Sequence, residues 1–129
     1  SQRANFELVF ERKGEPISIP TEVARAIFFV FQEALSNVEK HAQATRVTVE
    51  VAWTKENFQL IISDNGIGFR PSFVDTSSHF GLGIMQERIS SVGGIIDLES
   101  VVDKGTTLTV TVPLSRVVSS VVEIMREVT

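Results

Sequence analysis

The order of strand-like and helix-like segments predicts an α+β fold, in the form of a two-layer α/β sandwich. Five short segments alternate apolar with polar residues, and two longer segments carry apolar residues at helical spacing. They follow one another in the order β-α-β-β-α-β-β, so strands come in hairpins with helices between them. This order predicts a mixed sheet of about five strands with helices on one face, and it differs from the sustained alternation of a Rossmann fold.

Length and composition restrict the class of protein. A chain of 129 residues with 43% hydrophobic content suits one globular domain with a buried core. Its net charge of -4 argues against nucleic acid as the main partner. No apolar run reaches the ~18 residues of a membrane span, and no segment resembles a signal peptide. The absence of cysteine excludes disulfides and thiolate metal sites and fits a reducing, cytoplasmic setting.

The first half of the chain begins with a short strand at residues 6–10. A helix is predicted to start at Pro20-Thr21, with Thr21 as its N-cap, and to run to about His41. One face of this helix is apolar, and its residues recur at helical spacing: Val23, Ile27, Val30, Phe31, Ala34 and Val38.

The remaining elements are two hairpins separated by a second helix. The predicted strands are residues 47–53, 58–63, 95–101 and 106–112. The second helix is expected at 83–92, where Gly93-Gly94 ends it, and residues 70–80 show no clean period and predict a mobile loop. We expect a domain at residues 1–114, followed by a tail at 115–129 that is amphipathic and helical and that docks onto the domain. The alternatives for the tail are a partner-facing helix or the start of another segment.

Three polar residues, Glu33, Asn37 and Lys40, form one edge of the long helix beside its apolar face. Asn37 offers an uncharged oxygen for Mg²⁺, Lys40 can neutralise phosphate, and Glu33 can orient water or an attacking group. The alternative is an ordinary solvated helix edge. His41 lies near the centre of the apolar stripe, so it is either a packed core histidine or a residue that reaches a phosphate.

Two strands end in a polar residue on their apolar face. Asp64 has the parity of Phe58, Leu60 and Ile62, and Thr106 has the parity of the apolar residues that follow it. A buried carboxylate needs a partner, and the amino group of an adenine is a suitable donor. The alternative is that Asp64 caps the Asn65-Gly66 turn and that Thr106 simply follows a turn.

Two glycine pairs flank the predicted loop. Gly66 and Gly68 follow Asp64, whereas Gly81 and Gly83 precede the second helix, whose first N–H groups favour phosphate. Each pair alone is explained by ordinary turns. Both pairs together with the polar helix edge predict a nucleotide pocket.

These residues resemble the motifs of one family, the catalytic ATP-binding domains of bacterial sensor histidine kinases, within the wider group of gyrase B, mismatch-repair ATPases and large heat-shock chaperones. Residues 31–42 are similar to the N box and 64–69 to the G1 box. Phe80-Gly81-Leu82-Gly83 with residues 85–88 is similar to the G2 region, and Gly105-Thr106-Thr107 to the last motif. The resemblance covers about residues 5–114 and is greatest to the nitrate-sensor and DesK-like subfamily.

The resemblance implies a Bergerat-type fold, a five-stranded sheet under three helices, with ATP between the long helix and a flexible lid. It implies that Asn37 binds Mg²⁺, that Asp64 binds the adenine amino group and that Thr106 assists at the base. The other ATP-binding residues that it implies are Lys40, His41, Gly66, Gly68, Phe69, Gly81, Leu82 and Gly83. Glu33, Asn37 and Lys40 are the expected catalytic residues.

The resemblance also implies a two-component signalling function, in the cytoplasm or in the cytoplasmic portion of a membrane-bound sensor. The domain would donate the ATP γ-phosphate to a histidine on a separate dimerisation domain that this chain lacks, and a response regulator would act downstream. Without that domain we expect a monomer or weak dimer. The alternatives are an anti-sigma-type serine kinase, a self-contained ATPase and a non-catalytic nucleotide-binding module.

Overall fold

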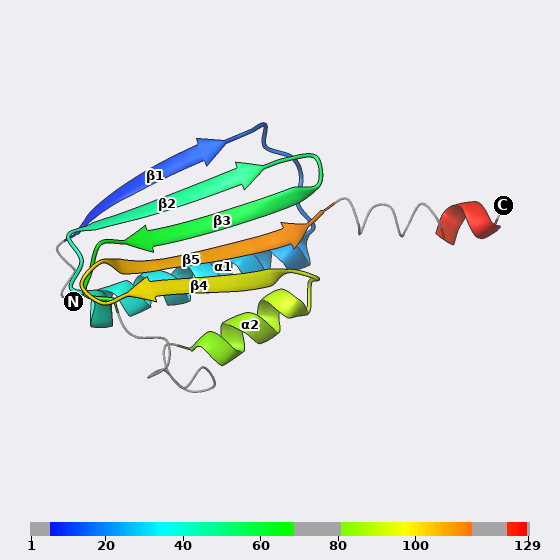
Figure 1. Ribbon diagram of the computed structural model, residues 1–129. Helices are drawn as coiled ribbons and strands as arrows, with labels where there is room; N and C mark the ends of the chain where they lie inside the picture. The colour runs from blue at the N-terminus through cyan, green and yellow to red at the C-terminus, as the bar shows by residue number, and fades with distance from the viewer. Residues whose placement is uncertain (1–5, 69–80, 115–123, 129) are drawn as a thin grey trace.

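The computed structural model describes residues 6–68, 81–114 and 124–128. The order of elements along the chain is the predicted one (Figure 1). The elements are β1 Glu7–Lys13, α1 Thr21–Asn37, η1 Val38–Ala42, β2 Arg46–Trp53, β3 Asn57–Asp64, α2 Leu82–Ser90, β4 Ile95–Val101 and β5 Gly105–Pro113.

The five strands form one mixed sheet in the order β1-β2-β3-β5-β4. β1 pairs in parallel with β2, and the other three pairings are antiparallel. Figure 1 shows α1 and α2 on the same face of this sheet. The predicted α+β sandwich of two layers is therefore confirmed.

The hydrophobic core lies between the sheet and the helices. Alternate residues of β3 and β5, such as Leu60 and Val110, are buried, and they face Val30 and Ile89 of the helix layer, both of which are 0% exposed. The opposite parity carries polar pairs, in which Gln59 bonds Thr111 and Ser63 bonds Thr107, each at 3.1 Å. A sheet with one apolar and one polar face needs only one covering layer, which explains the two-layer architecture.

The ends of the long helix differ from prediction. Thr21 is the first helical residue and not the N-cap, which is Pro20, whose carbonyl accepts the N–H of Ala24 at 3.0 Å. Proline suits this position because its φ is fixed and its carbonyl remains free to accept. At the other end, the α-helix stops at Asn37 and continues as the single π-helical turn η1, which is followed by Gln43 in a left-handed conformation (φ 51°).

The only tryptophan of the chain, Trp53, ends β2 at the far end of the sheet. Its ring meets Phe58 edge-on, with 5.5 Å between ring centroids. Its indole nitrogen is buried, and no hydrogen-bond partner for it occurs in the described part of the chain. Both rings line an apolar cavity between α1 and the first strands.

Two predicted segments fall wholly or partly outside the described residues. They are the loop at 70–80, together with its neighbour Phe69, and the tail, of which residues 115–123 and 129 are not described. Within the tail, residues 124–128 are helical and exposed, so the expected docking is not seen for these five residues. Among the helices that the structure describes, none is long and apolar enough to cross a membrane.

Candidate nucleotide-binding site

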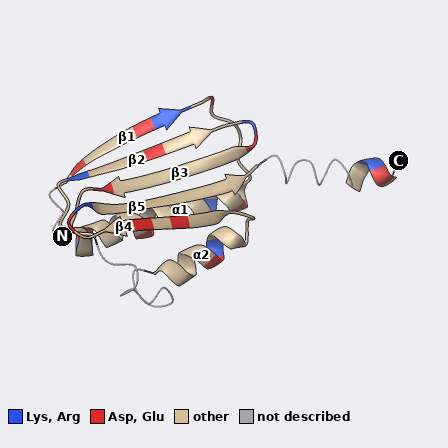
Figure 2. Cartoon of the chain, viewed as in Figure 1, with Lys and Arg blue, Asp and Glu red and all other residues tan. Residues whose placement is uncertain are grey.

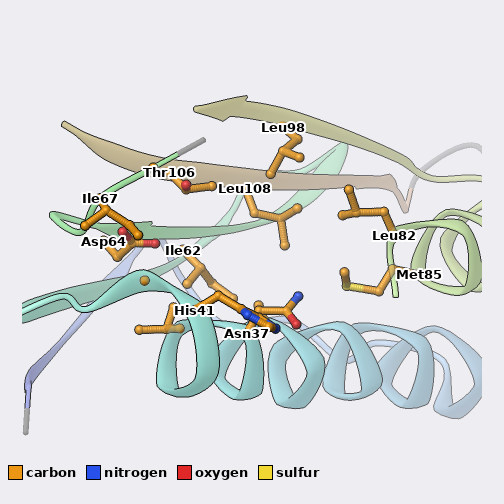
Figure 3. A pocket seen from close by; sticks show the side chains of 14 residues that line it. Asn37, His41, Ile62, Asp64, Ile67, Leu82, Met85, Leu98, Thr106 and Leu108 are labelled. Carbon is orange, nitrogen blue, oxygen red and sulfur yellow. The ribbon is translucent and has the colours of Figure 1, made fainter. Parts of the chain in front are cut away.

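A cavity of about 330 Å³ opens between the end of α1 and the adjoining ends of β3 and β5 (Figure 3). Its volume falls in the range of small-ligand pockets. The residues that line it are Ala34, Asn37, Val38, His41, Ala42, Ile62, Asp64, Ile67, Gly68, Leu82, Met85, Leu98, Thr106 and Leu108. Sequence-predicted site residues from all four motifs are therefore found around one cavity.

Six of the expected ATP-binding residues line the cavity: Asn37, His41, Asp64, Gly68, Leu82 and Thr106. Four others, Lys40, Gly66, Gly81 and Gly83, are described but do not line it, and neither does the expected catalytic residue Glu33. Phe69 lies outside the described residues.

Asp64 and Thr106 are paired across the ends of β3 and β5. Asp64 is half-buried, and its Oδ1 accepts the N–H of Gly66 at 2.8 Å, so this residue does cap the turn, as the alternative interpretation proposed. A carboxylate has two oxygens, so the turn role leaves further acceptor capacity at the cavity. Figure 3 shows Asp64 and Thr106 on the sheet side, across the cavity from Asn37 and His41.

Thr106 has a hydroxyl partner that the sequence did not single out. Its Oγ1 lies 2.7 Å from Oγ of Ser100 on β4, and the same Ser100 oxygen lies 3.3 Å from the carbonyl of Gly105. Ser100 and Thr106 are register partners, so strand pairing brings them together. Only the pairing of β4 with β5 could have revealed this contact.

Close approach between chain segments explains two of the glycines. A Cβ on Gly66 would lie 2.1 Å from the carbonyl oxygen of Ala42, and a Cβ on Gly68 would lie 2.2 Å from that of Val101. Gly68 and Gly81 also have positive φ, 62° and 67°. Glycine is needed here for the chain to pack against itself, and this packing shapes one end of the cavity.

The π-helical turn decides which side chains reach the cavity. His41 is exposed and lines the cavity, so the alternative of a packed core histidine is wrong. Lys40 is exposed and does not line it. A π turn holds more residues than an α turn, so the helical spacing that places Glu33 and Asn37 on one edge no longer applies at residue 40.

Glu33 is half-buried and lies toward the start of α2. Its Oε1 is 3.1 Å from the position that a Cβ on Gly81 would take. Gly81 in turn is the N-cap of α2, and its carbonyl accepts the N–H of Met85. Glu33 is therefore next to the helix start at which a phosphate is expected.

The cavity is mainly apolar, with few polar groups at its rim. Asp64 is the only charged acid that lines it, and none of the described lining residues is lysine or arginine. Figure 2 shows charged positions on the neighbouring elements, including acidic ones along β4. No three histidine, aspartate or glutamate side chains cluster as a metal site in the described ranges. Such a cavity fits an aromatic base, with its polar atoms at Asp64 and Thr106.

Several apolar residues that line the cavity lie outside the motifs. Ile62 and Leu108 pair across β3 and β5, and Met85 and Leu98 come from α2 and β4. The parity of Ile62 with Asp64, and of Leu108 with Thr106, is a signal in the sequence that could have identified two of them.

The residues that line the cavity could supply only some of the ligands of a Mg²⁺ ion. Asn37 supplies a neutral oxygen at the cavity, which suits a Mg²⁺ ion that keeps most of its waters and takes its other ligands from phosphates. The residues present therefore fit a nucleotide that brings its own metal ligands.

The sequence also matches known proteins. Residues 22–116 match the family model described as Histidine kinase-, DNA gyrase B-, and HSP90-like ATPase. The chain is 39% identical over 112 residues to sensor histidine kinase LiaS of Bacillus subtilis (strain 168), covering 80% of this chain and 31% of that protein. It is 33% identical over 94 residues to oxygen sensor histidine kinase NreB of Staphylococcus carnosus (strain TM300), covering 73% and 27%. The chain thus spans less than a third of these relatives.

Two solved structures share the fold. The blue-light activated histidine kinase of Erythrobacter litoralis EL346 superposes with a TM-score of 0.71 at 21% identity, covering 88% of this chain and 37% of that one. Histidine kinase AdeS of Acinetobacter baumannii gives 0.70 at 18% identity, covering 86% and 55%. With the family match over residues 22–116, the chain belongs to the histidine kinase-, DNA gyrase B- and HSP90-like ATPase family and is an ATP-binding domain of the sensor histidine kinase type.

Proposed function

We propose that this domain binds Mg²⁺-ATP and donates the γ-phosphate to a histidine on a separate dimerisation domain. The observation that carries the proposal is the apolar cavity with Asp64 and Thr106 at its sheet side and Asn37 at its helix side. The names of the relatives, which are sensor histidine kinases, support histidine as the acceptor.

The base occupies the apolar cavity in this proposal. Its exocyclic amino group donates to the Asp64 carboxylate, and the Thr106 hydroxyl bonds the same edge of the ring. Gly66 and Gly68 hold the backbone that forms this end of the cavity, and Phe69 follows them. The apolar lining excludes water, so the carboxylate is a stronger acceptor than it would be in solvent.

The phosphates extend from the base toward the start of α2. There Gly81, Leu82 and Gly83 offer the first N–H groups of the helix. Asn37 would hold Mg²⁺, and the bound ion would neutralise phosphate charge. Lys40 and His41 are exposed and lie on the turn that follows Asn37. In this proposal His41, which lines the cavity, approaches the phosphate oxygens, and Lys40 neutralises phosphate charge from outside the cavity. Glu33, beside Gly81, orients the attacking imidazole.

Transfer breaks the bond between the γ-phosphorus and the β,γ-bridging oxygen and forms a bond from phosphorus to an imidazole nitrogen. ADP keeps the electron pair of the broken bond. The protein contributes positioning and charge neutralisation to such a reaction. The phosphorylated histidine of the dimerisation domain is then the phosphate donor for a response regulator. The proposed location is the cytoplasm.

Nucleotide binding is tested by Asp64→Asn with isothermal titration calorimetry of ADP and Mg²⁺. A hydrogen bond to a charged group contributes roughly 1.5–3 kcal/mol, so we expect about 10- to 100-fold weaker binding. Asp97→Asn, at an exposed position on β4, is the matched control and should bind like the wild type. Unchanged affinity in Asp64→Asn would remove the proposed adenine contact.

The acceptor is tested with γ-labelled ATP and two purified substrates. One is a dimerisation domain of a sensor histidine kinase, and the other is a serine-bearing anti-sigma antagonist protein. Acid-labile label on the first supports the proposal. Acid-stable label on the second alone would identify a serine kinase, and phosphate release without either acceptor would identify an ATPase.

A further inference from the structure

We propose that Asn65, which has no role in the binding described above, is a positioning residue that sets the spacing between the two walls of the nucleotide cavity. The inference rests on the proposed nucleotide function. Asn65 follows Asp64 directly, and its side chain reaches across to the segment that leaves η1. It thus ties the end of β3, which carries Asp64, to the short segment that joins η1 to the start of β2.

Three side-chain hydrogen bonds and one backbone bond make this link. Oδ1 of Asn65 accepts the N–H groups of Thr45 and Arg46, both at 2.9 Å. Its Nδ2 donates to Oγ1 of Thr45 at 2.8 Å. The backbone N–H of Asn65 donates to the carbonyl of Arg46 at 3.2 Å. Every polar group of this side chain is therefore used, in an amide geometry that no other residue type reproduces in full.

The next two residues complete the junction. The N–H of Ile67 donates to the carbonyl of Ala42, the last residue of η1, at 2.7 Å. Gly66 lies so close to the same carbonyl that there is no room for a Cβ. Between Ala42 and Thr45 the chain turns through Gln43, whose φ of 51° is costly to hold without external contacts.

The position of η1 relative to β3 therefore depends on Asn65. Its contacts are exposed, and Asn65 is absent from the buried core. Loss of its side chain should leave the sheet and the helix layer folded. It should instead release the turn that carries His41 and follows Asn37, so that the two walls lose their fixed separation and nucleotide affinity falls.

The test compares Asn65→Ala with Asn65→Asp in the 129-residue chain, with Mg²⁺-ADP as the ligand. Asn65→Ala should weaken binding by tenfold or more at a temperature where circular dichroism shows both variants fully folded. Asn65→Asp keeps an acceptor for the two backbone N–H groups and should stay within about threefold of the wild type. Thr45→Val removes only the Nδ2–Oγ1 contact and is the matched control, with binding within about twofold.

A second readout does not depend on nucleotide. Amide hydrogen exchange of Ile67 and Arg46 should accelerate at least tenfold in Asn65→Ala and stay slow in Asn65→Asp. If Asn65→Ala does not fold, Asn65→Ser, with one short acceptor, takes its place and should show intermediate losses in both measurements.

The outcomes separate this inference from the proposed function. If the wild type binds no nucleotide while the exchange rates change as described, the proposed function fails and Asn65 still holds the junction. If the wild type binds Mg²⁺-ADP and the Asn65→Ala variant binds it equally well, the positioning role is overturned. Equal losses in the alanine and aspartate variants would overturn it too, because the acceptor would then not be the group that matters.

Discussion

At Gly66 the absence of a side chain allows two segments of the cavity wall to touch. Gly66→Ala should lower both stability and nucleotide affinity, the latter by more than tenfold, because the new methyl group would lie 2.1 Å from the Ala42 carbonyl and force the junction apart. Urea unfolding and calorimetry with Mg²⁺-ADP measure the two effects.

Gly93→Ala is the control for that substitution. Gly93 lies in the turn after α2 with a φ of 82°, and nothing lies within 4 Å of the position that a Cβ would take. Alanine there should cost about 1 kcal/mol of folding stability from backbone strain alone and leave nucleotide affinity unchanged. If Gly66→Ala behaved like Gly93→Ala, the close approach at Ala42 would not matter for binding.

Strand parity explains why single residues on the sheet were predicted well. Asp64 and Thr106 keep the parity of their strands to the end, so period two was enough to place both at the cavity. Lys40 and Ser100 were not predictable in this way. The position of Lys40 depends on a change from α-helix to π-helix, and the contact of Ser100 with Thr106 depends on which strand β4 pairs with.

At the scale of elements, η1 has the most influence on the site. A π turn holds one residue more than an α turn, so deletion of the exposed Glu39 should convert η1 into α-helix. We expect a folded domain with near-normal circular dichroism and at least tenfold weaker Mg²⁺-ADP binding, because His41 and the junction at Ala42 would rotate. Glu39→Ala, which keeps the length, should bind like the wild type. Full affinity in the deletion variant would show that the π turn is incidental.

The ends of a strand were predictable where apolar and polar residues alternate up to its last residue. They were not predictable where this alternation stops early. β4 spans Ile95–Val101, the predicted range. β1 extends to Lys13, beyond the predicted end at residue 10. The alternation of apolar and polar residues did not predict this extension, because the last three residues of this edge strand are all charged. Ion pairs there join β1 to β2, Arg46 to Glu7 at 3.2 Å and Lys13 to Glu50 at 3.4 Å. Each pair has at least one side chain that is more than 60% exposed, so their contribution to stability is small.

For the whole molecule, stability depends on one layer of helices covering one sheet. Ile89 of α2 is fully buried, whereas Ile84 of the same helix is 52% exposed. Ile89→Ala should cost about 2–4 kcal/mol, a large part of the stability of a small domain, and Ile84→Ala less than about 1 kcal/mol. Chemical denaturation followed by circular dichroism measures both. Equal costs would mean that α2 is not anchored through its buried face.

The global arrangement followed from element order, since hairpins with inserted helices leave few alternatives to a mixed sheet with one covered face. Element order did not reveal how the two ends of the domain differ. β2 starts at Arg46, which bonds Asn65 beside the nucleotide cavity, and it ends at Trp53, on the opposite side of the domain.

That separation makes Trp53 a natural optical reporter. Its indole packs on Phe58 at the end of β2 that is remote from Asp64, with its N–H shielded from solvent. The emission of this single fluorophore should shift to longer wavelength when the whole domain melts, yet it should stay nearly constant while ligand fills the opposite end. A single fluorescence experiment would then distinguish variants that cannot fold from variants that fold and cannot bind.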